Sequence, residues 1–170
     1  TVAALVTGVA WYHYTYMRDA WATTFAMGNG QSPIVLRYVD WLITVPLQVT
    51  EFYLILAAVG VATAALFWRL FGASLLMLIT GYLGEAESGT GGLVEGMEML
   101  MFFIGCAAWF YIMYEVWGGE AQKSAATASE STQFAFKAMA GILTVGWAIY
   151  PIGYFMGTGD DPNIDGLNIL

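Results

Sequence analysis

Five long apolar stretches, each followed by a short polar segment, dominate the pattern of residues along the chain. These stretches are residues 1–17, 33–60, 65–84, 97–118 and 133–157. A helix needs about 20 residues to cross the hydrocarbon core of a bilayer, so we interpret each stretch as a membrane-spanning helix. The first is shorter and has no basic leading region, so we expect most of a helix there and not a signal peptide.

Polar segments rich in glycine, proline and charged residues lie between these stretches and predict loops. They are residues 18–19 with 27–33, 85–98, 118–132 and 160–166. Residues 167–170 predict the opening of one more helix. Because the pattern starts and stops within apolar helices, we expect residues 1–170 to form a single transmembrane domain truncated at both ends.

Composition supports the membrane interpretation and excludes other classes. Apolar residues make up 59% of the 170 residues and charged residues 11%, whereas soluble domains average about 25% charged residues. Cys106 is the single cysteine, so no disulfide forms within the chain. A net charge of −8 with five basic residues argues against binding of nucleic acid. The sequence therefore predicts an all-α integral membrane protein.

The loop charges predict an orientation. Arg69, Lys123 and Lys137 fall on one side of the predicted spans, and Arg18 falls on the other. The acidic residues of the longer loops share the side of Arg18; they are Glu85, Glu87, Glu95, Asp160, Asp161 and Asp165. The positive-inside bias places the side of Arg69 and Lys123 in the cytoplasm.

A row of polar side chains lies within the second apolar stretch. At about 100° per residue, Asp40, Thr44, Gln48 and Glu51 share one helical face, and Arg37 lies close to it. The two carboxylates are separated by roughly 16 Å along the axis. Ionisable groups at membrane depth are costly and face protein or water. We interpret them as two stations of a proton relay, the alternative being polar contacts that hold helices together.

His13 is the only histidine and lies in the preceding span, at a depth close to that of Asp40. An imidazole beside a carboxylate modulates its protonation. The alternative is a histidine that only packs in the helix interface.

Aromatic side chains suggest a slot for an elongated apolar cofactor. Trp147, Tyr150 and Pro151 share one side of the last span, and Trp41 and Trp109 occur in two other spans. An aromatic stripe of this kind also occurs in ordinary packing.

Several strings of residues resemble the microbial rhodopsins, and most of all the proteorhodopsins, over essentially the whole chain. These strings are residues 11–18 (WYHYTYMR), 37–47 (RYVDWLITVPL), 51–58 (EFYLILAA), 81–86 (GYLGEA) and 146–155 (GWAIYPIGYF). The resemblance implies a bundle of seven transmembrane helices that binds retinal through a Schiff base. It also implies a multi-pass protein of the bacterial inner membrane.

The five spans then correspond to helices B to F of the family, with helix A and most of helix G missing. The retinal lysine and a second counterion aspartate belong to helix G of the family. Lys123 and Lys137 do not substitute for that lysine, since both lie at the cytoplasmic ends of their spans. We therefore expect that this chain alone does not hold retinal covalently.

The resemblance implies a light-driven outward proton pump with four ionisable residues in named roles. Asp40 would be the counterion of the Schiff base and the proton acceptor, and Arg37 would lie on its extracellular side. Glu51 would be the cytoplasmic proton donor. His13 would form a hydrogen bond with the acceptor.

The resemblance also implies which side chains line retinal. Gln48 falls at the colour-tuning position, where glutamine marks the blue-absorbing type. The other lining residues would be Trp41, Thr44, Met77, Trp147, Tyr150 and Pro151, with Gly105 and Trp109 as weaker candidates.

Two alternatives stay open at this point: a sensory rhodopsin-type photoreceptor, and a helical membrane subunit without retinal. The donor carboxylate at Glu51 argues against the sensor. No nucleophile with a neighbouring base, metal cluster or phosphate-binding loop is evident, so we expect a transporter and not an enzyme, without a metal. The expected partners are the lipid bilayer and protons, with self-association into a homo-oligomer and no nucleic acid.

Overall fold

The computed structural model describes residues 1–26, 34–85 and 96–157, and all regular structure within them is helical. The helices, in chain order, are α1 (Val2–Ala26), α2 (Ile34–Ala58), α3 (Ala64–Glu85), α4 (Glu98–Trp117), α5 (Glu120–Ala125) and α6 (Glu130–Gly157). The predicted all-α class is thereby confirmed. The predicted loop residues 27–33, 86–95 and 160–166 and the predicted helix opening at 167–170 lie outside the described residues.

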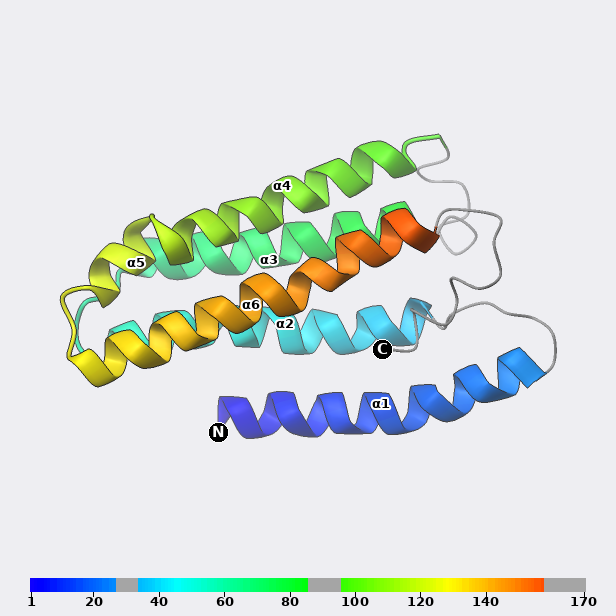
Figure 1. Ribbon diagram of the computed structural model, residues 1–170, viewed down its shortest axis with the longest axis horizontal. Coiled ribbons are helices and arrows are strands. Elements are labelled where there is room, and N and C mark those ends of the chain that lie inside the picture. The colour runs from blue at the N-terminus through cyan, green and yellow to red at the C-terminus, as the bar shows by residue number, and fades with distance from the viewer. Residues whose placement is uncertain (27–33, 86–95, 158–170) are drawn as a thin grey trace.

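The five long helices run alongside one another in an elongated bundle, and the short α5 lies at one end of it (Figure 1). We call this the α5 end; the connection from α2 to α3 also lies there. The other end, where α1 finishes and α2 begins, is the opposite end. The most extensive packing is between α3 and α4, followed by α2 with α3 and α1 with α2.

Two glycines allow α3 and α4 to approach closely. A Cβ atom at Gly84 would lie 3.0 Å from the carbonyl oxygen of Glu98, and one at Gly105 would lie 3.1 Å from Thr80 Oγ1. Small residues at such positions let helix backbones approach within a membrane, where van der Waals contact drives association. The α3–α4 pair is accordingly the tightest in the bundle.

The prediction of a loop at residues 18–19 was wrong, because α1 continues without interruption to Ala26. Residues 19–26 contain neither glycine nor proline, and three of them are alanine, the strongest helix former. Charge alone does not end a helix. The first glycine after this segment is Gly28.

The segment 118–132, predicted as a polar connection, contains α5 and the start of α6. Ala121 and Ala125 are one helical turn apart and both are buried, so α5 has a small apolar face that packs on the bundle. Helix α6 begins at Glu130, three residues earlier than predicted. The hydroxyl of Ser129 accepts the backbone N–H of Thr132 at 3.4 Å, as a residue at a helix N-cap does.

The hydrophobic core lies toward the α5 end. Phe52 of α2 and Phe136 of α6 meet edge to face there, with ring centroids 5.2 Å apart. The buried cluster consists of Val49, Phe52, Leu56, Leu66, Leu70, Ile112, Val116, Ala121, Ala125, Phe136, Ala140 and Leu143. This half of the bundle is closely packed.

The exterior of the bundle is apolar as well. Trp68, Phe110, Phe134, Ile142 and Val145 are each more than 60% exposed. A soluble protein does not expose so many large apolar side chains together. Four stretches are long and apolar enough to cross a membrane, namely Arg37–Ala58, Ala64–Gly84, Glu98–Ala125 and Glu130–Ile152. They match the last four predicted spans; the first stretch, 1–17, is helical but is not one of the four.

The core at the α5 end should carry much of the stability. We expect Phe52→Ala to lower the free energy of unfolding by about 2 kcal/mol or more, because the cavity it leaves removes contacts that lipid cannot replace. Phe134→Ala is the matched control, since Phe134 is 76% exposed. Equilibrium unfolding in detergent micelles measures both, and equal losses would contradict this view of the core.

Candidate functional site

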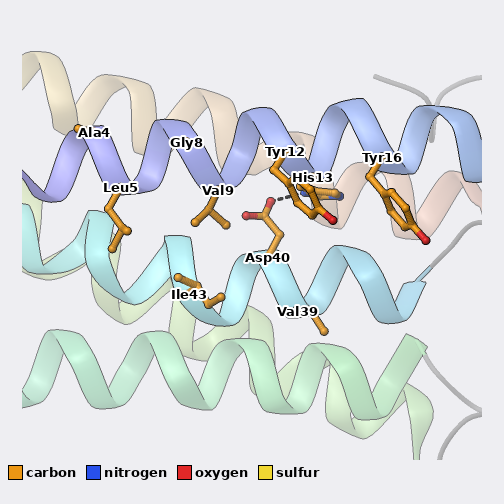
Figure 2. A pocket seen from close by; sticks show the side chains of 10 residues that line it. All are labelled: Ala4, Leu5, Gly8, Val9, Tyr12, His13, Tyr16, Val39, Asp40 and Ile43. Atoms are coloured by element: carbon orange, nitrogen blue, oxygen red, sulfur yellow. Dashed lines mark hydrogen bonds and ion pairs between the residues drawn. The ribbon is translucent and has the colours of Figure 1, made fainter.

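A buried carboxylate lies where α1 and α2 pack together. Asp40 belongs to the second turn of α2 and is only 6% exposed. It points across to α1, where its Oδ2 contacts Nδ1 of His13 (Figure 2). The His13 side chain is itself 9% exposed. The structure thus brings together two of the residues predicted from the sequence, and they come from neighbouring helices.

The second oxygen of this carboxylate has no hydrogen-bond partner among the described residues. Asp40 Oδ1 is buried, and no described residue forms a hydrogen bond with it. The hydroxyl of Thr44 donates to the main-chain oxygen of Asp40 at 3.1 Å and not to its carboxylate. Buried polar atoms are nearly always paired, because an unpaired one loses its hydration without compensation. Asp40 Oδ1 is therefore suited to receive a proton or a cationic donor.

A groove between α1 and α2 leads to this pair (Figure 2). Its volume is about 500 Å³, and its lining is apolar apart from the side chains of Asp40 and His13 and two tyrosines. The lining residues are Ala4, Leu5, Gly8, Val9, Tyr12, His13, Tyr16, Val39, Asp40 and Ile43. Of the predicted site residues, only Asp40 and His13 line it.

One turn away, a cation and three aromatic rings form a second group. The guanidinium carbon of Arg37 lies 5.6 Å from the ring centre of Trp41, within the range of a cation–π interaction. Tyr150 of α6 meets the edge of Trp41 at 4.6 Å between ring centroids. Trp41 therefore connects α2 with α6 beside Asp40.

Sequence reasoning missed Tyr38, the third ring of this group. It is buried, and its ring lies 5.1 Å from Trp41 and 5.2 Å from Tyr82 of α3. A Cβ atom at Gly81 would lie 3.0 Å from the hydroxyl oxygen of Tyr38. The spacing of Tyr38 and Trp41 by three residues on the helix of Asp40 is the signal that could have found it.

The other predicted residues of α2 continue along the same helix. Thr44 is buried, and Gln48 and Glu51 are partly buried. Glu51 lies eleven residues after Asp40, which is roughly 16 Å along the axis. It directly precedes Phe52, a residue of the buried core. The two carboxylates are thus separate groups in different surroundings.

The remaining predicted lining residues come from three helices. Gly105 lies where α4 packs closely on α3. A Cβ atom at Gly105 would lie 3.4 Å from the carbonyl oxygen of Met77. Trp109 has a buried Nε1 atom that no described residue accepts. Trp147 packs against the core cluster, and Pro151 is a partly buried residue inside α6.

The two lysines of the sequence lie away from Asp40. Lys123 belongs to the last turn of α5, and Lys137 lies in the second turn of α6. Both therefore lie toward the α5 end, whereas Asp40 lies near the opposite end (Figure 1). An amine that pairs with Asp40 Oδ1 does not come from either of them.

Sequence reasoning also missed a polar cluster at the α5 end. Arg69 of α3 forms an ion pair with Glu120 of α5, and its Nε lies 3.4 Å from Oε1 of Glu115. Glu115 is 3% exposed and also accepts the hydroxyl of Tyr111 and the backbone N–H of Glu120, each at 2.9 Å. A Cβ atom at Gly119 would lie 2.5 Å from Glu115 Oε2, so this position requires glycine.

This cluster holds α5 against α3 and α4. The sequence analysis used Arg69 only for orientation. The sequence signal that could have revealed the cluster is the pair of glutamates at positions 115 and 120, which lie at the same end of the spans as Arg69.

The pairing of His13 with Asp40 should appear as an energetic coupling. Removing one member of a buried pair strands the other, so we expect His13→Ala to destabilise the protein much less when Asp40→Asn is already present. The expected coupling is about 2 kcal/mol or more. A double-mutant cycle in detergent micelles measures it, with Thr15→Val on the exposed face of α1 as the additive control. Additive effects of His13→Ala and Asp40→Asn would contradict the pairing.

Comparison with known proteins gives the same family throughout. The family model for bacteriorhodopsin-like proteins matches residues 1–168. The green-light absorbing proteorhodopsin of Gamma-proteobacterium EBAC31A08 is 47% identical over an alignment that covers 100% of this chain and 64% of that protein. The blue-light absorbing proteorhodopsin of Gamma-proteobacterium Hot 75m4 is 48% identical over 92% of this chain and 58% of that protein.

A solved structure agrees with these relatives. The crystal structure of blue light-absorbing proteorhodopsin from Med12 superposes with a TM-score of 0.72 at 48% identity. That match covers 99% of this chain and 70% of the other. The chain spans less than two thirds of the length of the two curated relatives. Family model, sequence identity and fold together show that the chain belongs to the bacteriorhodopsin-like family of helical membrane proteins.

Proposed function

We propose that the protein is a light-driven outward proton pump that uses retinal, with Asp40 as proton acceptor and Glu51 as cytoplasmic proton donor. The proposal rests on the Oδ1 atom of Asp40, which is buried and has no hydrogen-bond partner among the described residues. The green- and blue-light absorbing proteorhodopsins at 47% and 48% identity support the reaction class. A transporter, and not an enzyme, fits both.

The residues around Asp40 fit a cationic, apolar chromophore. Oδ1 lacks a partner, and Trp41 and Tyr150 present aromatic surface one turn away. When bound, retinal would absorb the light and supply a protonated nitrogen whose proton can be transferred. Trp41, Tyr150, Met77, Trp109 and Trp147 would hold the polyene, with Thr44, Pro151 and Gly105 completing the lining.

Asp40 accepts the proton, and its neighbours control when it does. The contact with His13 holds Oδ2 and leaves Oδ1 as the accepting atom. Arg37 lies over the ring of Trp41, so its positive charge stays within one helical turn of the carboxylate. The barrier to transfer is low when acceptor and donor are within hydrogen-bond reach in a site without water.

Glu51 returns a proton from the other side. It lies roughly 16 Å further along α2 toward the α5 end, which the positive-inside bias of Arg69 and Lys123 makes cytoplasmic. A carboxylic acid placed there can act as a general acid that supplies a proton. Net transport is outward because the donor Glu51 lies toward the cytoplasmic end of α2 and the acceptor Asp40 toward its other end. We also propose that the protein forms a homo-oligomer and that residues 1–170 belong to a single transmembrane domain.

Replacing each of the two carboxylates by its amide should impair proton pumping in a different way. In the full-length protein reconstituted with retinal, Asp40→Asn should abolish light-driven acidification of the medium. Glu51→Gln should keep the pigment but slow proton uptake by about 100-fold, the scale of a lost general acid. Glu130→Gln, at the exposed start of α6, is the matched control. A pH electrode and flash spectroscopy measure both effects; unaltered uptake in Glu51→Gln would remove the donor, and pumping in Asp40→Asn would remove the acceptor.

Gln48 should tune the colour toward the blue. Its amide lies two turns from Asp40 on α2 and would adjoin the polyene, where dipoles fixed for the ground-state charge stabilise the ground state more than the excited state. Gln48→Leu should therefore shift the absorption maximum to longer wavelength with pumping largely retained. Gln122→Leu on α5 is the matched control. An unchanged spectrum, or a shift to shorter wavelength, would contradict the blue-absorbing assignment.

A further inference from the structure

Helix α6 is the least buried of the four stretches that are long and apolar enough to cross a membrane. Phe134, Ile142 and Val145 on its outer face are more than 70% exposed. Aromatic rings join it to α2 at two levels. Phe136 meets Phe52 near the α5 end, and Tyr150 meets Trp41 near the opposite end.

A hydrogen bond joins α6 to α4 between these two levels. The indole Nε1–H of Trp117 donates to Thr144 Oγ1 at 2.8 Å. The hydroxyl of Thr144 donates in turn to the carbonyl oxygen of Ala140, at 2.7 Å within its own helix. Thr144 Oγ1 also lies 3.2 Å from the sulfur of Met113 on α4. Its oxygen thus accepts from Trp117 on α4, while its hydrogen is within reach of both the Ala140 carbonyl on α6 and the Met113 sulfur on α4.

This bond lies between the exposed face of α6 and the candidate site. Thr144 is partly buried in the middle of α6 and lies six residues before Tyr150, or roughly 9 Å along the axis. Trp147, between the two, packs against the core cluster. Rotation or outward movement of α6 at Thr144 therefore displaces the ring that touches Trp41.

We propose that Thr144 is a positioning residue: with Trp117 it fixes the rotation and lateral position of α6 against α4, and thereby holds Tyr150 on Trp41 beside Asp40. A single interhelical hydrogen bond within a membrane changes the equilibrium constant for helix association by between about threefold and about thirtyfold. The structural part of this inference stands without retinal. Its kinetic consequence rests on the proposed function.

The structural test measures the separation of α4 and α6 without using pump activity. Spin labels at positions 110 and 149, both on exposed side chains, are introduced in a background with Cys106→Ser, and their distance distribution is recorded in lipid nanodiscs. We expect Thr144→Val to increase the population of longer distances by about threefold to thirtyfold. Thr144→Ser keeps the hydroxyl and should show the same distance distribution as the parent protein.

Matched variants separate the interhelical bond from other effects. Thr15→Val removes a hydroxyl that donates only to the carbonyl of Trp11 in its own helix, at 2.8 Å, and should leave the distribution unchanged. Trp117→Phe removes the N–H donor and keeps an aromatic ring, and it should reproduce the effect of Thr144→Val. The double variant should then show no further increase. Parent-like distances in both Thr144→Val and Trp117→Phe would overturn the proposal.

The kinetic test is made on the full-length protein with retinal. Thr144→Val and Trp117→Phe should change the rate of proton uptake after a flash by threefold or more, and Thr144→Ser should restore the parent rate. Altered distances with unaltered uptake would overturn the link to the site. If the parent protein does not pump while the distances change as expected, the proposed function fails and the structural part of the inference is supported.

Discussion

The cost of burying a carboxylate among apolar helices determines much of this structure. Asp40 lies in a stretch that is long and apolar enough to cross a membrane, and it is almost inaccessible. A carboxylate in such surroundings needs a partner, because burial removes its hydration. His13 provides the partner for one oxygen. Helix α1 must therefore pack on α2 at the level that brings the imidazole to Asp40.

The bundle has two halves that differ in packing and in how their polar groups are paired. Toward the α5 end, buried apolar side chains form the core, and the polar cluster of Arg69, Glu115 and Glu120 lies beside it with its charges paired. Toward the opposite end, Asp40 has an unpaired oxygen and aromatic rings meet across helices. The polar atom without a partner is thereby separated along the bundle axis from the closely packed core. Glu51 lies between Val49 and Phe52, two residues of that core.

Apolar length and polar phasing were enough to predict the helices and the polar row, because both depend on one helix at a time. The spans beginning near residues 33, 65, 97 and 133 agree with α2, α3, α4 and α6 to within a few residues. Helix ends were less predictable, since charge at Arg18 did not outweigh the alanine-rich segment after it. The resemblance of residues 37–47 and 146–155 to microbial rhodopsins identified the family that the comparisons show.

Contacts between helices were the part that sequence reasoning could not reach. The His13–Asp40 pair was proposed from similar depth and a family resemblance, and its geometry needed the structure. Tyr38, the cluster around Glu115 and the bond from Trp117 to Thr144 were missed, because each joins residues far apart in the chain. Periodicity reports which face a residue occupies and not which neighbour it meets. The roles assigned to Asp40, Glu51 and the lining residues stay proposals for the same reason.

The polar cluster at the α5 end has a consequence for biosynthesis. Glu115 is a buried acid near the end of an otherwise apolar helix, and a carboxylate there opposes partitioning from the translocon into lipid. Its counter-charge, Arg69, lies in the helix synthesised just before it. Because Gly84 and Gly105 also let the two backbones approach closely, α3 and α4 are suited to enter the bilayer together as a helical hairpin. The nascent chain would then neutralise Glu115 before α6 has left the ribosome.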